Sequence, residues 1–419
     1  MRARLVPLPL CLLLLGARLA PAQVTASISG KVEDAAGGPV RGATVTAKNV
    51  ETGATRTAIT DDQGNYRILS LAIGPEEVKA EKTGFRSAVR TGVNLAVGQE
   101  AVVNLQLEVG EITQEVTVSA DAPLVNTTTA QISGLVTEQQ VKDLPLNGRS
   151  FDNLITLNPG AISYSAMKSA GTSTSNGNTF TVAGRRTSEN LFLLNGIEYT
   201  GSSQLAITPG GVSGELLGID AIREFNVQTD TYSAEYGKRA GAQVTVITQS
   251  GSNVLHGALF EFLRNSDLDA RNFFDQAFVP PFRRNQFGGA LGGPLKRDKL
   301  FLFGNYEGFR QALAETNVSV VPDNQARQGI LPNVQKDCSV INAQVASLNL
   351  NMLPYMLVWP GQNGPELMAS CTAPDGTLHQ VPTGTALSYN NPHQSIREDF
   401  GTLRSDYVIS QQDSVSAAY

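Results

Sequence analysis

The sequence is poor in charged residues, in side chains that commonly bind metals, and in long apolar runs. Charged residues make up 17% of the 419 residues, whereas an ordinary soluble domain has about 25%. There are only three histidines, three cysteines and one tryptophan. No apolar stretch reaches the ~18 residues that a membrane-spanning helix needs. These shortages exclude a coiled coil, a nucleic-acid-binding protein with a large basic surface, and a metal protein built on histidine and cysteine.

Motifs for catalysis are also missing. None of His256, His379 and His393 is followed three residues later by glutamate, as a zinc peptidase would require. The sequence has no Gly-x-x-x-x-Gly-Lys-Ser/Thr phosphate loop and no Gly-x-Ser-x-Gly elbow. We therefore expect no catalytic residues, no metal ligands and no cofactor, and we predict that the chain is not an enzyme.

The N-terminus has the pattern of a signal peptide. Arg2 and Arg4 precede an apolar run at residues 5–15, and small residues surround Pro21 before a cleavage point after Ala22. We predict a signal peptide at residues 1–22, so the protein is exported. The rest is rich in glycine, with 40 in the whole chain, and this composition favours short strands and turns.

Residues 24–108 read as short strands separated by turns. Three motifs carry the pattern, at residues 30–34 (GKVED), 39–45 (PVRGATV) and 60–66 (TDDQGNY). We expect strands at residues 27–32, 43–47 and 102–107, a hairpin turn at Asp61, and Tyr66 in the core. The motifs resemble the carboxypeptidase regulatory-like domain, which implies a transthyretin-like β-sandwich of the carbohydrate-binding-like fold and no peptidase activity.

The middle of the chain mixes two kinds of segment. Residues 109–135 are rich in threonine and valine with few turn signals, which predicts an extended connector. Residues 136–252 carry both strand and helix signals, including a short helix at residues 139–144 that Pro145 ends. We expect a small α+β domain there.

Residues 253–419 contain segments of alternating or aromatic-rich sequence. We expect five strands, at residues 255–264, 284–293, 299–310, 397–409 and 414–419. Their connections are alternately long and short, as in a transmembrane β-barrel whose long loops lie outside and whose short turns lie in the periplasm. The alternation alone fits a soluble β-sandwich equally well.

Several motifs resemble TonB-dependent outer-membrane receptors, in the same order along the chain. Those similar to the plug domain are residues 144–151 (LPLNGRSF), 157–160 (LNPG), 184–186 (GRR), 192–196 (FLLNG), 233–241 (SAEYGKRAG) and 248–253 (TQSGSN). Those similar to the first barrel strands of the Oar-like branch are residues 283–289 (RRNQFGG), 292–294 (GGP) and 305–308 (NYEG). The chain departs from the family where Asn195 stands for a frequent aspartate and Gln249 for a usual lysine.

The resemblance implies a mainly β protein with a signal peptide, a sandwich, a small α+β plug and the first strands of an outer-membrane barrel. It implies energised uptake with no bond chemistry, a TonB-type energy-transducing partner, and contact with outer-membrane lipid but not with nucleic acid. The ligand would come from outside the cell, as a carbohydrate, a peptide or a siderophore. The alternative is a secreted or surface protein whose sandwich binds carbohydrate.

One segment of the connector resembles the TonB box, the short strand that contacts the energising partner in this family. Its residues are Glu115, Val116, Thr117, Val118, Ser119 and Ala120. An extended strand can add to the edge of a partner's sheet through its backbone groups. The alternative is that these residues form the last strand of the sandwich.

Two cysteines lie in the long connection at residues 311–396, which the barrel pattern assigns to the cell exterior. Because exported chains pass through an oxidising compartment, we predict a disulfide between Cys338 and Cys371. The alternative is two separate buried thiols.

Five strands cannot close a barrel, and an open sheet edge is not tolerated in lipid. Family members carry a barrel of about twenty-two strands. We therefore expect the reading frame of this protein, or that of intact relatives, to continue beyond Tyr419.

Overall fold

The structure is a computed structural model that describes most of the chain. The described residues are 25–110, 115–119, 132–146, 149–163, 180–199, 218–232, 237–271, 273, 275, 279–314, 316–345, 351, 353–411 and 413–419. The predicted signal peptide at residues 1–22 lies outside them. No described helix is long and apolar enough to cross a membrane. The chain divides into two compact units: Met1–Phe260 with Phe287–Gly308 and Glu398–Tyr419, and Glu261–Gln286 with Phe309–Arg397.

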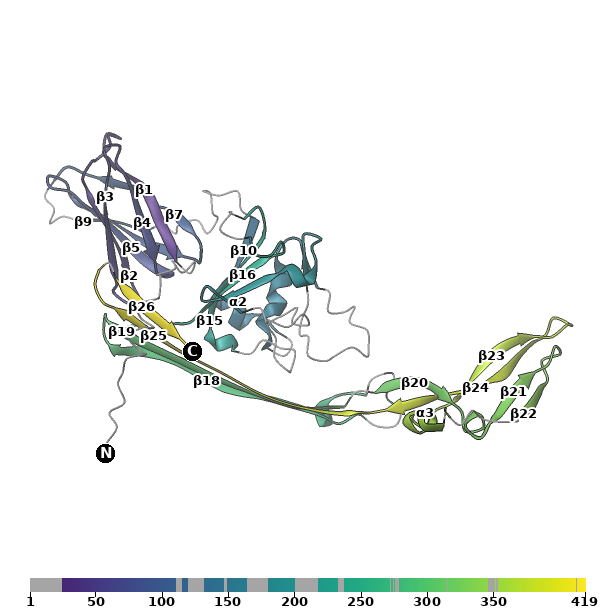
Figure 1. Ribbon diagram of the computed structural model, residues 1–419. Coiled ribbons are helices and arrows are strands. Elements are labelled where there is room, and N and C mark those ends of the chain that lie inside the picture. Colours follow the sequence, from purple (N-terminus) through teal and green to yellow (C-terminus); the bar gives the residue numbers. More distant parts are fainter. Residues whose placement is uncertain are drawn as a thin grey trace, which may run out of the picture. The chain divides into compact units, whose positions relative to one another are not determined.

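The first nine strands build a two-sheet sandwich (Figure 1). They are β1 (Ala26–Asp34), β2 (Thr44–Asn49), β3 (Thr55–Ile59), β4 (Asn65–Leu71), β5 (Gly74–Glu81), β6 (Ser87–Leu95), β7 (Glu100–Val102), β8 (Leu105–Leu107) and β9 (Glu115–Ser119). One sheet has the order β4-β1-β7, with β8 also on β1, and the other has the order β3-β2-β5-β6-β9. Alternate residues of both sheets are buried in one shared core, among them Ile28, Val45, Val78 and Leu107.

The turn before β4 forms as predicted. Asp61 accepts hydrogen bonds from the backbone N–H groups of Gln63 and Asn65, at 2.9 and 2.7 Å. These bonds hold the pKa of Asp61 below its usual value, and the bond from the Asn65 N–H has the largest effect. Gly64 has φ +79°, and a Cβ there would lie 2.6 Å from the Val32 carbonyl oxygen. Tyr66 then enters the core, as predicted, at 4% exposure.

The strand predicted at residues 102–107 is two strands. β7 ends at Val102 and β8 begins at Leu105, and both pair in parallel with β1. Between them, the Val103 carbonyl accepts a 2.6 Å hydrogen bond from the Tyr66 hydroxyl. The Asn104 side chain accepts a 3.0 Å bond from the Lys31 N–H. The Val103 N–H still donates to the Ser29 carbonyl at 2.8 Å, but at Asn104 a side chain takes the place of the backbone acceptor, so the prediction of one continuous strand is wrong.

Glu76 lies on the core-facing side of β5 and is 2% exposed. One carboxylate oxygen accepts a 2.9 Å hydrogen bond from Asn49 Nδ2, and the other has no hydrogen-bond partner among the described residues. Burial raises the pKa of Glu76 from 4.5 to about 7, opposed by the bond from Asn49 and reinforced by Glu51. The folded sandwich therefore favours the protonated acid.

This raised pKa makes the sandwich less stable as pH rises. Between pH 4.5 and 7 the folded state binds more protons at Glu76 than the unfolded chain does, so the free energy of unfolding falls, by up to ~3 kcal/mol. Glu76→Gln should remove this part of the pH dependence and be more stable than wild type at pH 8. Urea midpoints of both proteins from pH 4.5 to 8 measure the difference. Parallel pH profiles for the two would contradict the assignment.

The predicted plug domain has a five-stranded sheet, a separate two-stranded sheet of β11 and β12, and helical segments (Figure 1). Its strands are β10 (Ile132–Val136), β11 (Ala161–Ser163), β12 (Phe180–Val182), β13 (Leu191–Leu194), β14 (Ile197–Glu198), β15 (Ile222–Asp230) and β16 (Gln243–Thr248). Its helices are α2 (Glu138–Asp143) and the 3₁₀ turns η2 (Phe151–Leu157), η4 (Thr187–Glu189) and η5 (Ile219–Ala221). The sheet order is β10-β15-β16-β13-β14, and β16 is buried along its whole length. β10 begins inside the segment predicted as connector.

The short helix predicted before Pro145 is α2. Thr137 and Gln140 form a reciprocal capping box at its start, which satisfies two backbone N–H groups that a helix end leaves open. Only Val141 is buried, and it joins the plug core that includes Phe225 and Val244. The cap and this single anchor explain why so short a helix forms here.

All five strands predicted after residue 253 are present and form one sheet, which Figure 1 shows as long neighbouring ribbons. They are β17 (His256–Asn265), β18 (Phe282–Lys296), β19 (Leu300–Ala314), β25 (His393–Val408) and β26 (Ser414–Ala418), in the order β17-β18-β19-β25-β26. A 3₁₀ turn, η6 (Ser266–Leu268), follows β17. β18, β19 and β25 are longer than predicted, and β18 continues through Pro294 to Lys296.

The long connection between β19 and β25 is folded. It contains β20 (Asn317–Pro322), β21 (Ile330–Val334), β22 (Val340–Gln344), β23 (Glu366–Thr372), β24 (Leu378–Asn390), α3 (Leu353–Val358) and η7 (Ala326–Gln328). β20, β24 and β23 make a three-stranded sheet, and β21 pairs with β22 as a hairpin. These elements belong to the second unit together with the ends of the barrel strands that flank them.

Candidate functional site

The segment similar to a TonB box forms β9, at the edge of a sandwich sheet. Its residues from Glu115 to Ser119 pair in parallel with β6, in the register Val116 with Ala88 and Val118 with Arg90. This is the arrangement that the sequence left as an alternative, a last strand of the sandwich rather than a separate connector. β9 stands at the end of the sheet order, so one of its backbone edges has no strand beside it among the described residues. Ala120 lies outside the described residues.

The plug is attached to the barrel sheet through a buried ion cluster. Arg149 donates a 2.7 Å hydrogen bond to Asp220 and lies 4.1 Å over the ring of Phe260 in β17. Its Nε is 4.0 Å from one oxygen of Glu307 in β19. The other oxygen of Glu307 accepts a 2.7 Å hydrogen bond from the Gly218 N–H. Because the Glu307 side chain is completely buried, these partners replace the water that its charge would otherwise require.

A second attachment joins β25 to the plug. Arg404 donates a 2.9 Å hydrogen bond to the Thr248 carbonyl at the end of β16, while its Nε is held 3.0 Å from Asp406. Thr248 is positioned in turn by Asn195, whose side chain accepts from the Thr248 N–H at 3.0 Å and donates to its hydroxyl at 2.9 Å. The Asn195 amide thus both donates to and accepts from Thr248.

The sandwich and the plug also touch within the first unit. The Val97 N–H donates a 2.6 Å hydrogen bond to Glu224 of β15, and Arg223 donates two bonds of 2.8 and 3.0 Å to Glu51. Ile73, Val97 and Ile247 form a small buried cluster beside them. Burial raises the pKa of Glu224 to about 6, opposed first by the bond from Val97.

The roles of these attachment residues were not predicted from the sequence. Arg149 and Glu307 lie in motifs that resemble the family, but Gly218 and Asp220 do not. One local signal was available: Phe301, Phe303 and Glu307 occupy odd positions of an alternating strand, so a charged residue falls on the same face as large apolar ones. Such an inward glutamate requires a partner.

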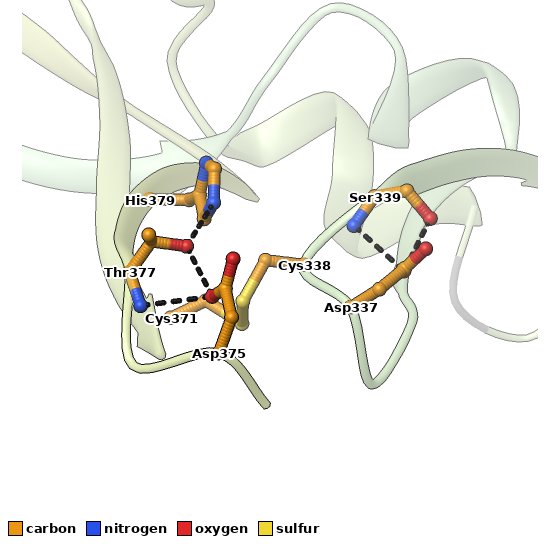
Figure 2. Close-up of a disulfide and its surroundings, with 7 residues drawn as sticks. All are labelled: Asp337, Cys338, Ser339, Cys371, Asp375, Thr377 and His379. Atoms are coloured by element: carbon orange, nitrogen blue, oxygen red, sulfur yellow. Dashed lines mark hydrogen bonds between the residues drawn. A yellow bond between two sulfur atoms is a disulfide. The ribbon is translucent and has the colours of Figure 1, made fainter. Parts of the chain in front are cut away.

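The second unit contains a disulfide between Cys338 and Cys371, whose Cα atoms are 5.8 Å apart. It joins the turn before β22 to β23, and Figure 2 shows it between two aspartate turns. Asp337 accepts hydrogen bonds from Ser339, and Asp375 accepts from Thr377. These hydrogen bonds lower the pKa of both aspartates. The cysteines pack with Ala373 and Val381 in a small local core.

Replacing both cysteines by serine should loosen this segment. The bond closes a loop with a sequence separation of 33 residues, which stabilises it by roughly 3–4 kcal/mol in the chain-entropy model. We expect faster amide hydrogen exchange in β21–β24 of the variant, and the same increase in reduced wild type. Thiol titration of the unfolded, unreduced protein should find neither cysteine free. Two free thiols would contradict the pairing.

Within the described residues, no group of three or more histidine, cysteine, aspartate or glutamate side chains could hold a metal ion.

Three family models match consecutive parts of the chain. The carboxypeptidase regulatory-like domain matches residues 27–108, the TonB-dependent receptor plug domain matches residues 125–244, and an outer membrane beta barrel domain matches residues 247–419. Their order is the order predicted from the motifs. The matches confirm the mainly β architecture with a regulatory-like domain, a plug and barrel strands, and they place the protein in the outer membrane.

Similar proteins include known transporters. The TonB-dependent transporter Oar of Myxococcus xanthus is 27% identical over 298 residues, which is 67% of this chain and 26% of that protein. The chain thus spans about a quarter of the length of this relative. The outer membrane transporter YddB of Escherichia coli has a TM-score of 0.37 at 13% identity, covering 67% of this chain and 31% of that one. The siderophore receptor PirA of Acinetobacter baumannii has a TM-score of 0.31 at 16% identity, and the match covers 68% of this chain and 43% of that one.

Proposed function

We propose that this chain, which belongs to the TonB-dependent receptors of the outer membrane, serves the energised uptake of an extracellular ligand. The family points to a transporter rather than an enzyme. In the proposal the chain performs no bond chemistry: the ligand is bound outside and passes the plug when a TonB-type protein of the inner membrane pulls on it.

The attachment of the plug to the barrel sheet is the observation that supports this proposal most directly. A plug that must open under load needs contacts that are specific but few. Arg149 and Arg404 supply such contacts with Glu307 and Thr248. Breaking a buried ion pair costs about 3–5 kcal/mol, because an uncompensated charge remains, so these contacts hold the plug until a load pulls them apart. Displacement of a few side chains would therefore free this face of the plug.

We propose β9 as the contact for the energising partner. The partner would add a strand to the free edge of β9, which needs only backbone N–H and C=O groups. This docking does not require β9 to leave β6. A pull on the added strand would act on the chain directly before β10, the first strand of the plug sheet.

Uptake by whole cells tests the proposed function. Cells with the receptor, without it, and without the energy-transducing partner would be given mixtures of carbohydrates, peptides and siderophores. Mass spectrometry of washed cells should find at least one compound that accumulates only when both proteins are present. Accumulation that is unchanged without the partner would contradict energised uptake. Release of the protein in soluble form, with retention on glycan, would support the carbohydrate-binding alternative.

A further inference from the structure

A basic pocket of about 540 Å³ lies within the second unit, on the ends of four barrel strands. Its lining consists of Leu263, Asn265, Arg283, Asn285, Arg310, Gln311, Ala312, Ser395, Ile396 and Arg397. Among these described residues three are arginines and none is acidic. Asparagine and serine side chains stand beside the arginines, so the pocket combines positive charge with neutral hydrogen-bonding groups. Such a set of donors suits a phosphate group.

Side-chain alternation places the arginines on the outer face of the strands. Arg284, between Arg283 and Asn285, points the other way: it donates to Gln311 at 2.8 Å and lies over the rings of Phe282 and Phe309. Phe309 is fully buried. Because successive residues of a strand point to opposite faces, Arg283 and Arg310 face away from this buried cluster.

The same outer face is apolar further along each strand. In β18, Leu291 and Leu295 point to the same face as Arg283 and are 61% and 66% exposed. In β17, Leu259 points to the same face as Leu263 and is 91% exposed. In β25, Leu403 points to the same face as Arg397 and is 51% exposed. A row of exposed leucines on one face of a barrel sheet is the surface that meets lipid tails.

An aromatic pair lies between the arginines and the four leucines Leu259, Leu291, Leu295 and Leu403. The rings of Phe287 in β18 and Tyr306 in β19 are 6.4 Å apart, and the alternation along each strand places both residues on the outward face. Aromatic girdles mark the level at which lipid tails give way to headgroups. From Leu295 to Phe287 the strand rises ~26 Å, or roughly 20 Å across the membrane at the usual tilt, close to the ~25 Å of an apolar band.

Arg283 therefore falls at headgroup level, four residues beyond Phe287. This end of the strands is opposite the tight turn between β18 and β19, hence on the outer side of the membrane. On the outward faces of β17 and β25, Glu261 and Asp399 lie outside the pocket lining, and Asp399 accepts a 2.7 Å bond from the Tyr306 hydroxyl.

We propose that Arg283, Arg310 and Arg397, with Asn285, bind the phosphate group of a phosphorylated lipid in the outer leaflet. This site differs from a transport site because it faces the lipid and not the barrel interior. It rests on the outer-membrane location alone, so its success or failure does not depend on the proposed uptake.

Lipid binding by the receptor extracted from its own outer membrane tests the proposal. The receptor would be placed in phosphatidylcholine nanodiscs doped with a phosphorylated glycolipid or with the same lipid after dephosphorylation, and bound lipid would be counted by native mass spectrometry. The triple variant Arg283→Gln, Arg310→Gln, Arg397→Gln should lower the apparent affinity for the phosphorylated lipid roughly 100-fold, since each cation near a membrane surface contributes ~1 kcal/mol. The dephosphorylated lipid should bind the wild type as weakly as the phosphorylated lipid binds the variant.

The matched control removes three positive charges from the other end of the same sheet, as Lys296→Gln, Arg297→Gln, Lys299→Gln, and should bind like wild type. Equal binding by the triple variant and wild type would overturn the proposal. So would equal binding of both lipids, or complete displacement by millimolar inorganic phosphate, which would indicate a site for free phosphate. If the triple variant does not insert into the membrane, the single variant Arg283→Gln should bind the phosphorylated lipid with an affinity about five-fold lower than wild type. Lysine at all three positions should then keep most of the affinity, and an unchanged Arg283→Gln would refute the assignment.

Discussion

Proline at the position of β9 whose N–H faces the free edge, either Val116 or Thr117, should abolish energised uptake while ligand binding at the cell surface remains intact. Proline removes the backbone N–H at its position in β9 and cannot take part in a strand ladder on that side. Uptake should fall to the level of cells that lack the energising partner. Val116→Thr keeps the backbone donor and a β-branched side chain, so it should transport normally.

A second proline distinguishes the two edges of β9. Successive residues of a strand direct their backbone groups to opposite sides. Of Val116→Pro and Thr117→Pro, one therefore loses a bond to β6 and the other loses a donor on the free edge. The variant affected on the free edge should be the one without uptake and without partner binding in pull-down, while the other should increase hydrogen exchange in β6. Full uptake by both variants, correctly inserted, would rule out β9 as the contact strand.

Arg149→Met should loosen the plug from the barrel sheet. The change keeps an apolar chain over Phe260 but leaves the carboxylate of Glu307 buried without its cation. Removing one partner of a buried ion pair costs about 3–5 kcal/mol. We expect faster protease cleavage of the plug and entry of dyes that wild-type receptor excludes.

Two further variants make this test specific. Arg149→Met leaves both Glu307 and Asp220 without their cation. Adding Glu307→Gln removes one of these two charges, so the double variant should recover part of the lost protease resistance. Lys142→Met is the control, because Lys142 pairs with Glu138 on the surface of α2, where such pairs contribute little. If Arg149→Met is as resistant as this control, the ion cluster does not hold the plug.

Local sequence patterns were sufficient to predict where most strands, the helix α2 and the Asp61 turn lie. The five barrel strands appear where alternation and tight turns predicted them, and α2 ends where Pro145 stops it. The Asp61 turn and the buried Tyr66 followed from an Asp-Asp-x-Gly-x-Tyr motif. In each case the determining interaction lies within a few residues of chain: a turn that requires glycine, a helix that proline ends, or side chains alternating between two faces.

Pairings between distant segments could not be derived in this way. β9 reads as a strand, but nothing in its residues indicates that it pairs with β6, because backbone hydrogen bonds are the same for any partner. Between β7 and β8, the Val103 carbonyl accepts a hydrogen bond from Tyr66, 37 residues away. The contact of Glu307 with Gly218 spans 89 residues.

The sequence by itself therefore determined the order of domains, the positions of most strands and the location in the outer membrane. Only the tertiary structure decided which charges meet. Arg149 and Glu307 look like ordinary members of two motifs until folding brings them 4.0 Å apart in a buried site. Arg283, Arg310 and Arg397 belong to three strands and form one pocket only because those strands are aligned in a single sheet. Charges that are solvated and independent in the unfolded chain become coupled once folding removes the water between them.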